Sequence, residues 1–345
     1  MGRIFYLNIL ILLLISCKDN EEVTSFENVE KTTSPASIGK IGNNKDLESI
    51  VSTGFLLMGG GWDVDKAMYW MIEKVNGGDI KILRASGGDA YNQYLFNLAD
   101  GRVNSVETLL IDSRDLANDQ ELIKNLETAE GIFIAGGNQA DYVKFWGNTK
   151  LAATLARLVI DKKIVLGGTS AGCAILGEYI FDALKGTVYS DEVLNDPYIE
   201  YASLQKNTLF DIEILQNVIT DTHYNNPSRI GRHIAFMARL KKDFNSNAKG
   251  IGVEEETAVV IEEDGLAHVF GKGKAYFLES IGSDLPEVIA EEKPLTWGIN
   301  KKAIRALVLK ENTEEYIDLN NWNNFNSSLI QLISVENGVL KIENK

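Results

Sequence analysis

The sequence is poor in the residues that several common kinds of site require. Its 345 residues include two cysteines, three histidines and five prolines. Two cysteines are too few for a disulfide scaffold or for a cysteine-rich zinc module. Lysine and arginine number 34 against 49 aspartates and glutamates, so the formal net charge is −15. Phosphate backbones repel so acidic a chain, and we expect no nucleic acid among its partners.

The N-terminal segment has the pattern of a bacterial export signal. Its apolar run from Ile4 to Ile15 is shorter than the roughly 20 residues that a membrane-spanning helix needs, and has the length of a signal-peptide hydrophobic segment. Leu14 to Cys17 resembles a lipobox, whose cysteine is lipidated and becomes the mature N-terminus. We therefore expect a lipoprotein signal peptide over residues 1–16, lipidation of Cys17 and anchoring to a bacterial envelope membrane, either periplasmic or at the cell surface. An ordinary signal peptide with an incidental cysteine is the alternative.

Composition divides the rest of the chain into three parts. Residues 17–50 are rich in polar and charged side chains and have almost no apolar periodicity, so we expect a disordered polar tether. Residues 51–282 carry the apolar patterns of a folded domain, and 45% of the whole chain is hydrophobic, enough for a sizeable core. Residues 283–345 contain short strand patterns separated by turns, which predict a C-terminal β-rich extension.

The predicted domain alternates short apolar runs with helical patterns. We expect strands at 55–58, 80–84, 106–111, 132–135 and 164–166, with helices between them. Such an alternation predicts an α/β fold with a mostly parallel sheet and helices on both faces. Ligands of these sheets bind beyond the carboxyl ends of the strands. Glycine clusters stand at three of those ends, at 59–61, 136–137 and 167–168, so we expect them to meet in space.

Ser170 lies between a buried strand and the apolar start of a helix. Gly168 and Gly172 frame it as Gly-x-Ser-x-Gly, the pattern of a nucleophile elbow. Small neighbours permit a tight turn that projects the hydroxyl, and the helix N-terminus directs free N–H groups towards developing negative charge. Two alternatives remain: Ser170 only caps the helix, or Cys173, one turn later, is the nucleophile.

A serine nucleophile needs a base, and the chain offers three histidines. His223 follows an apolar run and stands at the end of a strand, so it is the expected base. His233 lies in a helical pattern among packing residues, and His268 lies in a strand pattern near a glycine turn. We expect both of these histidines to be structural.

A third group must orient the imidazole of the base. Glu254, Glu255 and Glu256 stand at the entry to a strand, although consecutive acids are also typical of a solvated loop. Glu178 and Asp182, after the elbow helix, are the other candidates.

Two arginines follow the expected base. Pro227 and Ser228 are typical of a helix start, which puts Arg229 and Arg232 on one face of a helix just beyond His223. Two guanidinium groups at that place could bind a substrate carboxylate. The alternative is two surface arginines.

Together these residues resemble the cyanophycinase and aspartyl-dipeptidase group of serine peptidases, which have a class I glutamine amidotransferase-like, flavodoxin-like fold. Five segments carry the resemblance in family order: Gly59–Gly61, Ile134–Gln139, Gly167–Gly172, Asp221–His223 with Arg229 and Arg232, and Gly250–Ala258. They cover roughly residues 54–280. Because the acid follows the histidine, the order also differs from the serine, acid, histidine order of α/β-hydrolases.

The resemblance implies a function and a role for each residue. It makes Ser170 the nucleophile, His223 the base and Glu255 the orienting acid of a hydrolase that cleaves peptide or isopeptide bonds next to aspartyl residues. The other residues to which it gives a role are Ala171 and Gly137 in the oxyanion hole, and Gln139, Asp221, Arg229 and Arg232 at the substrate. It implies no metal and no organic cofactor, and it suggests a homodimer.

The chain also departs from the family pattern. Pro227 stands where the cyanophycinase pattern has a further arginine, residues 182–210 form an insertion, and the sequence after about residue 280 has no counterpart. The family preference for β-aspartyl-arginine is therefore not carried over to this chain. Two other functions remain as alternatives: a lipid-anchored protein that binds peptides without turnover, and an amidotransferase-type cysteine hydrolase.

Overall fold

The computed structural model describes residues 34–162, 164–298, 302–312 and 314–345. The expected signal peptide, the lipidation site Cys17 and residues 17–33 of the expected tether lie outside the described residues. In the part that is described, no helix has both the length and the apolar character needed to cross a membrane.

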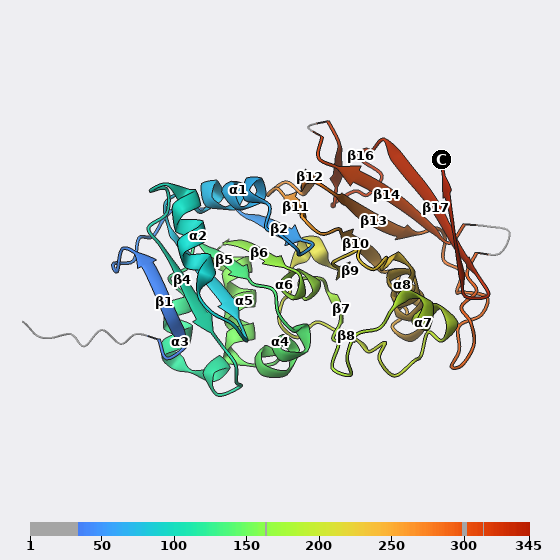
Figure 1. The fold of residues 1–345 in the computed structure, drawn as a ribbon, viewed down its shortest axis with the longest axis horizontal. Coiled ribbons are helices and arrows are strands. Elements are labelled where there is room, and N and C mark those ends of the chain that lie inside the picture. Colours follow the sequence, from blue (N-terminus) through green and yellow to red (C-terminus); the bar gives the residue numbers. More distant parts are fainter. Residues whose placement is uncertain (1–33, 163, 299–301, 313) are drawn as a thin grey trace, which may run out of the picture. The chain divides into compact units, whose positions relative to one another are not determined.

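The strands form two sheets (Figure 1). In the first, β4, β3, β5, β6 and β2 run parallel, while β1 and the strands from β11 onward are antiparallel. The order of β4, β3, β5 and β6 is that of a flavodoxin-like sheet. Across this sheet the strands are β1 (Ser37–Gly42), β4 (Ser105–Leu110), β3 (Asp79–Arg84), β5 (Gly131–Ile134), β6 (Val165–Thr169), β2 (Gly54–Met58), β11 (Thr257–Ile261), β12 (Leu266–Gly271), β15 (Tyr316–Asp318) and β16 (Phe325–Asn326).

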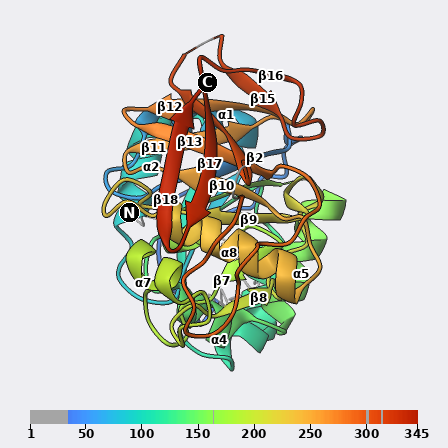
Figure 2. The same ribbon diagram turned by 90° about the vertical axis from the view of Figure 1, so that its right-hand side faces the viewer.

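The second sheet is mainly antiparallel and includes the C-terminal strands. Only the pairs β7–β9 and β9–β10 run parallel in it. Figure 2 shows β17 and β18 on the side of the molecule that faces the viewer. Across this sheet the strands are β18 (Val339–Asn344), β17 (Leu329–Glu336), β14 (Ile304–Lys310), β13 (Lys274–Ser280), β10 (Lys249–Val253), β9 (Val218–Asp221), β7 (Tyr179–Phe181) and β8 (Leu204–Lys206).

Helices cover both faces of the first sheet and one face of the second. The α-helices are α1 (Asp65–Val75), α2 (Ala90–Ala99), α3 (Gln120–Leu126), α4 (Gln139–Trp146), α5 (Lys150–Arg157), α6 (Ala171–Ala174), α7 (Ser190–Asn195) and α8 (Ile230–Asp243). On the first sheet, α1 and α2 pack on one face and α3, α4 and α5 on the other. The second sheet carries α7 and α8 (Figures 1 and 2). The elements expected over residues 55–166 are thus confirmed.

The alternation of side chains between the two faces of each buried strand explains why helices cover both faces of the first sheet. In β2, Phe55 and Leu57 belong to the buried cluster that includes α4 and α5, whereas Leu56 and Met58 belong to the cluster that includes α1. Successive side chains of a strand point to opposite faces, so a strand that is apolar throughout needs cover on both sides. Residues of β10, β13 and β14 join the same buried cluster as Phe55, which packs the two sheets against each other.

Three expectations need correction. The tether predicted over 17–50 contains β1, an edge strand that is held by backbone pairing with β4 and so needs little apolar burial of its own. The C-terminal region is β-rich as expected, but it completes both sheets, and Thr33–Lys345 form one compact unit without a boundary at residue 283. The sequence predicts one mostly parallel sheet for the domain, whereas the structure has two sheets and His223 follows β9, a strand of the second sheet.

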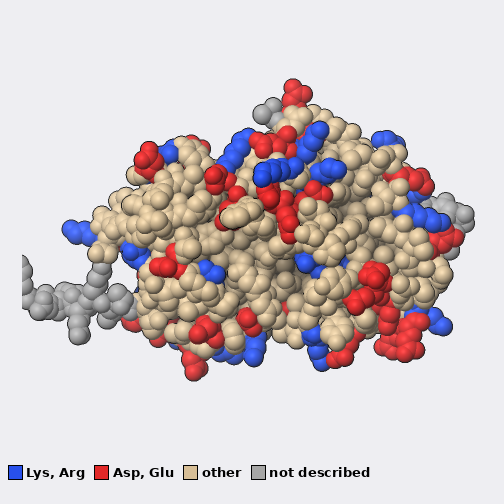
Figure 3. Space-filling view, in the orientation of Figure 1, with Lys and Arg blue, Asp and Glu red and all other residues tan. Residues whose placement is uncertain are grey.

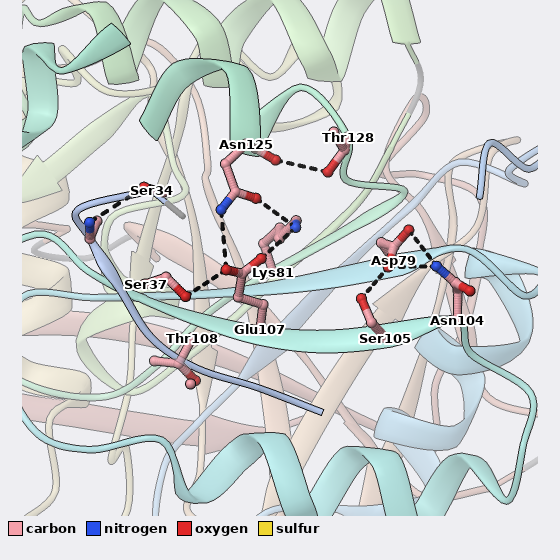
Figure 4. Close-up of polar contacts among 12 residues, drawn as sticks. Ser34, Ser37, Asp79, Lys81, Asn104, Ser105, Glu107, Thr108, Asn125 and Thr128 are labelled. Carbon is pink, nitrogen blue, oxygen red and sulfur yellow. Dashed lines mark hydrogen bonds and ion pairs between the residues drawn. The ribbon is translucent and has the colours of Figure 1, made fainter. Parts of the chain in front are cut away.

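A buried ion pair lies within the first sheet (Figure 4). The ammonium of Lys81 on β3 contacts Glu107 on β4 at 2.7 Å, and both side chains are almost fully buried. Asn125 of α3 accepts a hydrogen bond from Lys81 at 2.7 Å, and Ser37 of β1 donates to Glu107 at 2.6 Å. The pair therefore joins β1, β3, β4 and α3 at a place where a buried charge without a partner would be costly.

Candidate active site

Ser170 occupies the sharp turn between β6 and α6. Its φ of 52° and ψ of −119° are unusual for a residue with a side chain. The flanking glycines are required by close packing: a Cβ at Gly168 would lie 2.5 Å from the carbonyl carbon of Gly172, and a Cβ at Gly172 would lie 2.2 Å from the carbonyl oxygen of Ile134. The structure therefore contains the strand, tight turn and helix that the Gly-x-Ser-x-Gly pattern predicts.

Three side chains from distant segments form a hydrogen-bonded chain. The hydroxyl of Ser170 lies 2.7 Å from Nε2 of His223, and Nδ1 of that ring lies 2.7 Å from Oε1 of Glu255. About a quarter of the side-chain surface of His223 and of Glu255 is exposed, so the chain is open to solvent. With Nδ1–H donating to the carboxylate, Nε2 is left to accept the proton of the hydroxyl.

The loop after β2 holds this arrangement through its backbone. The N–H of His223 donates to the carbonyl of Gly59 at 2.8 Å, and the N–H of Glu256 donates to the carbonyl of Gly60 at 2.8 Å. The N–H of Ser170 donates to the carbonyl of Met58 at 3.0 Å. One short segment therefore fixes the backbone at or beside all three members of the chain.

The three consecutive glutamates have three different partners. Glu254 accepts a hydrogen bond from the hydroxyl of Tyr276 on β13 at 3.0 Å, and Glu256 pairs with Lys272. Only Glu255 points to the imidazole. The hydrogen bond from that ring is the main cause that lowers the pKa of the Glu255 carboxyl.

The other acids considered for this place are engaged elsewhere. Glu178 pairs with Lys206 at 2.8 Å, and Asp182 accepts a hydrogen bond from Ser203 at 2.9 Å. Cys173 is fully buried, and burial strongly raises the pKa of its thiol. A buried thiol without a nearby cation is a packing residue, not a nucleophile.

The two remaining histidines are part of the fold. His233 on α8 is fully buried, where its ring nitrogens contact the hydroxyl of Tyr224 at 3.1 Å and the carbonyl of Ile219 at 3.2 Å. His268 lies on β12, with Nδ1 3.2 Å from the carbonyl of Glu315. These contacts agree with the expectation that His233 and His268 have structural roles.

The turn after β5 lies against the serine. A Cβ at Gly136 would meet Cβ of Ser170 at 3.4 Å. The buried hydroxyl of Tyr142 donates to the carbonyls of Ala135 at 2.8 Å and Gly136 at 3.3 Å. Because carbonyl and N–H point in opposite directions in a trans peptide, these contacts direct the N–H groups of Gly136 and Gly137 away from Tyr142. The glycine clusters expected to meet are therefore brought together around Ser170.

A pocket of about 560 Å³ begins at this turn. Gly137, Gln139, Arg229 and Arg232 are among the residues that line it. The amide of Gln139 donates to the carbonyl of Phe181 at 2.6 Å, which ties α4 to β7. The wall is completed by residues 183–187, the start of the insertion that the sequence analysis identified.

Two expected substrate residues bind each other. Both carboxylate oxygens of Asp221 accept hydrogen bonds from Arg232, and both side chains are about 4% exposed. Burial opposes ionisation of Asp221, but the charge and hydrogen bonds of Arg232 outweigh it and lower the pKa of the carboxyl. Asp221 therefore lies behind the pocket and orients Arg232, instead of lining the pocket itself.

Arg229 has a different environment. The sequence predicts Arg229 and Arg232 on one face of a helix. The helix α8 begins at Ile230, however, so Arg229 is its N-cap residue and only Arg232 lies within the helix. Arg229 donates from Nη1 to the carbonyl of Thr222 at 2.9 Å, while its buried Nε has no hydrogen-bond partner among the described residues. Burial lowers the pKa of this guanidinium, and Arg232 beside it acts in the same direction.

The surface above β11 and β12 carries both signs of charge. Figure 3 shows acidic and basic side chains gathered together in the upper middle of this face. Among the ion pairs of these strands and their flanks are Lys272 with Glu256, and Lys66 with Glu311 at 2.6 Å. Such mixed charges produce no strong field of one sign, in contrast to the largely basic pocket.

One group of carboxylates could hold a metal ion among the described residues. Single oxygens of Asp46, Asp79 and Glu130 lie within 4.8 Å of one another. Asp79 begins β3 and Glu130 precedes β5, so this group lies at the amino ends of parallel strands, whereas Ser170 follows a carboxyl end. Asp79 also accepts hydrogen bonds from Asn104 and Ser105 (Figure 4).

The sequence analysis missed several residues of the site. Asn225 accepts a hydrogen bond from the N–H of Glu255 at 3.0 Å, and Lys144 and Lys185 line the pocket. Asn225 follows the expected base by two residues, and a polar side chain at that position was the available signal. The two lysines gave no such signal, because only folding brings α4 and the insertion to one pocket.

Comparisons with known proteins match this part of the chain. Residues 104–269 match the model of the family described as Peptidase family S51. A protein named Cyanophycinase from Synechococcus elongatus is 31% identical over 177 residues, which are 51% of this chain and 50% of that protein. Another Cyanophycinase, from Trichormus variabilis, is 30% identical over 194 residues, which are 55% of this chain and 59% of that protein. This chain therefore spans half to three fifths of the length of these relatives.

A solved structure, of a peptidase from an acI-B1 Actinobacterium, aligns with a TM-score of 0.47 and 17% identity, over 66% of this chain and 90% of that chain. The segment that matches the family model contains Gly136, Gly137, Ser170, His223 and Glu255. The resemblance to the cyanophycinase and aspartyl-dipeptidase group is therefore confirmed over this part of the chain, where residues 104–269 match the model of peptidase family S51.

Proposed function

We propose that this chain is a serine peptidase that cleaves peptide or isopeptide bonds next to aspartyl residues. The observation that supports this most directly is the hydrogen-bonded chain from Ser170 through His223 to Glu255, with 2.7 Å at each step. These residues lie beside a pocket, and Ser170 occupies a strand-to-helix elbow, the position of the serine nucleophile in other hydrolases.

The first half of the reaction forms an acyl-enzyme. The hydroxyl of Ser170 attacks the scissile carbonyl carbon while its proton passes to Nε2 of His223. Glu255 stabilises the imidazolium through Nδ1–H. The N–H groups of Ala171 and Gly137 donate hydrogen bonds to the carbonyl oxygen and stabilise the negative charge that develops on it. When the carbon–nitrogen bond breaks, Nε2 returns the proton to the leaving amine.

The second half releases the acid. A water molecule gives one proton to Nε2 of His223 and attacks the acyl carbon. The bond between that carbon and Oγ of Ser170 then breaks, and the proton returns from Nε2 to Oγ. Each residue of the chain ends in its starting state, and these residues alone supply the proton transfers.

The preference for an aspartyl residue rests on Arg229. Its guanidinium lines the pocket, and its buried Nε has no hydrogen-bond partner among the described residues. A buried donor of this kind is costly unless a ligand accepts from it. A carboxylate matches a guanidinium in charge and geometry, so an aspartyl carboxylate is the group that this position favours.

A fluorophosphonate probe tests the nucleophile directly. We expect the purified protein to be labelled and Ser170→Ala to remain unlabelled, with Ser190→Ala as a labelled control. A panel of α-aspartyl and β-aspartyl dipeptides then tests turnover, and Ser170→Ala should cleave none of them. Equal labelling of the wild type and Ser170→Ala contradicts the proposal. Binding of an aspartyl dipeptide without turnover by the wild type indicates the peptide-binding alternative.

Export and lipid attachment at Cys17 form a separate proposal, supported by the signal-like segment before that residue. In a bacterial host, we expect the full chain in the membrane fraction and Cys17→Ala released from it. Equal distribution of the two proteins between the fractions contradicts lipid anchoring and leaves the proposed activity untouched.

A further inference from the structure

The pocket beside Ser170 is larger and more basic than one aspartyl carboxylate requires. Its lining includes four basic residues, Lys144, Lys185, Arg229 and Arg232, against one acidic residue, Asp141. A volume of about 560 Å³ is within the range of pockets for small ligands and exceeds the needs of one short side chain.

The four cations are not equivalent. The charge of Arg232 is balanced by the buried Asp221, and Arg229 is the group that we assign to the aspartyl carboxylate. Lys144, on α4, and Lys185, in the insertion, remain for another part of the substrate.

Lys185 can be engaged by a substrate at little cost. It pairs with Glu200 at 2.9 Å, but more than half of each side chain is exposed. An ion pair in that environment is weak and is screened by solvent. Glu200 does not line the pocket, so its negative charge offsets the positive charge of the lining only from outside the pocket.

We propose that the pocket selects β-aspartyl isopeptides whose leaving amino acid is acidic. Arg229 binds the free α-carboxylate of the aspartyl residue, and the pocket also binds the side-chain carboxylate of the leaving amino acid. This deepens the proposed function and rests on it. Lys144 and Lys185 attract the added carboxylate, whereas a guanidinium in the same position would face cations of its own sign. Like charges brought together in this way suppress the wrong partner.

The test measures binding separately from turnover. Calorimetry with Ser170→Ala gives dissociation constants for β-aspartyl-glutamate, β-aspartyl-glutamine and β-aspartyl-arginine. The first two ligands have nearly the same shape and differ in charge. We expect the glutamate compound to bind about tenfold more tightly than the glutamine compound, and the arginine compound to bind most weakly, with the difference falling as salt is raised.

Charge removal in the pocket should abolish the preference. In the Ser170→Ala background, Lys144→Gln with Lys185→Gln should bring the glutamate and glutamine compounds to equal affinity. Lys124→Gln, at an exposed lysine on α3 that does not line the pocket, should leave the tenfold ratio unchanged.

Two results would overturn the inference. One is binding of β-aspartyl-arginine as tight as that of β-aspartyl-glutamate, and the other is a glutamate to glutamine ratio that survives the double substitution. Circular dichroism shows whether the double variant is folded. If it is not, Lys185→Gln alone, which changes an exposed side chain, is measured in its place. Failure of the proposed hydrolysis is read separately, as absent turnover and absent fluorophosphonate labelling in the wild type.

Discussion

Gly60 lies against the edge of the His223 imidazole, although the two residues belong to loops of different sheets. A Cβ built at Gly60 would come within 2.5 Å of both Cε1 and Nε2 of that ring. The φ of Gly60 is 96°, a conformation that residues with side chains rarely adopt. The glycine therefore leaves room for the imidazole on the side of its proton-accepting nitrogen.

We predict that Gly60→Ala reduces kcat by about 100-fold, because a methyl group at this place displaces Nε2 from Ser170, and a shift of about 1 Å has an effect of that size. Gly77→Ala is the matched control. Its φ is 88°, and a Cβ there meets nothing within 4 Å. Both variants should lose about 1–2 kcal/mol of stability from the backbone strain. Equal kcat values for the two would show that contact with the ring has no effect on the reaction.

The hydrogen bond between His223 and Glu255 provides a second test. Glu255→Gln retains the shape of the side chain but removes the charge that stabilises the imidazolium, so we expect kcat to fall by about 10²–10⁴-fold. Glu254→Gln changes a neighbouring carboxylate that binds Tyr276 instead, and should have little effect. Comparable kcat values in steady-state assays of the two variants would exclude Glu255 as the orienting acid.

The buried His233 should make stability depend on pH. Burial is the main cause that lowers its pKa from 6.5 to about 4, with the charge of Asp221 acting in the opposite direction. Between these two values the unfolded chain binds a proton that the folded chain does not, so stability falls as the pH is lowered from about 6.5 towards 4. The loss from this group approaches about 3 kcal/mol near pH 4.

Urea unfolding at several pH values measures this effect. We expect His233→Gln to have a flatter dependence between pH 6.5 and 4 than the wild type, even where its stability at pH 7.5 is lower. His268→Gln, at the partly buried histidine of β12, is the comparison variant and is measured over the same pH range. An unchanged slope in His233→Gln would assign the dependence to other groups.

The buried pair of Lys81 and Glu107 predicts a large effect on stability (Figure 4). Lys81→Met leaves the carboxylate of Glu107 buried without its cation, and we expect the free energy of unfolding to fall by about 3–5 kcal/mol. Lys124→Met, which removes an exposed lysine from its pair with Glu121, should change it very little. Lys81→Met combined with Glu107→Leu should recover part of the loss. A small effect of Lys81→Met alone in urea titrations would contradict the prediction.

Much of the fold could be predicted because local patterns report local structure. Short apolar runs between helical patterns identified β2 to β6 and the helices that cover them, since a strand buried on both faces must be apolar throughout. The three histidines left few choices for a base, and the glycines around Ser170 marked the elbow. By contrast, β1 escaped prediction, because an edge strand can be held by backbone pairing without an apolar pattern.

The sequence identified candidate residues for the site, but it did not show which of their side chains contact each other. From the residues alone, Glu254, Glu255 and Glu256 were equal candidates. Their different partners arise from the turn between β10 and β11, which sends each side chain in its own direction. The pairing of Asp221 with Arg232 was not visible either, since it requires β9 and α8 to be packed together.

The sequence by itself determined the strands and helices of the α/β core, the elbow at Ser170 and the choice of His223, because each depends on residues close together in the chain. Only the tertiary structure decided that two sheets meet at the site, that Lys144 and Lys185 line one pocket, and that Asp221 pairs with Arg232 and does not line this pocket. The physical reason is that contacts between distant segments depend on how the buried faces pack, and no local pattern records that packing.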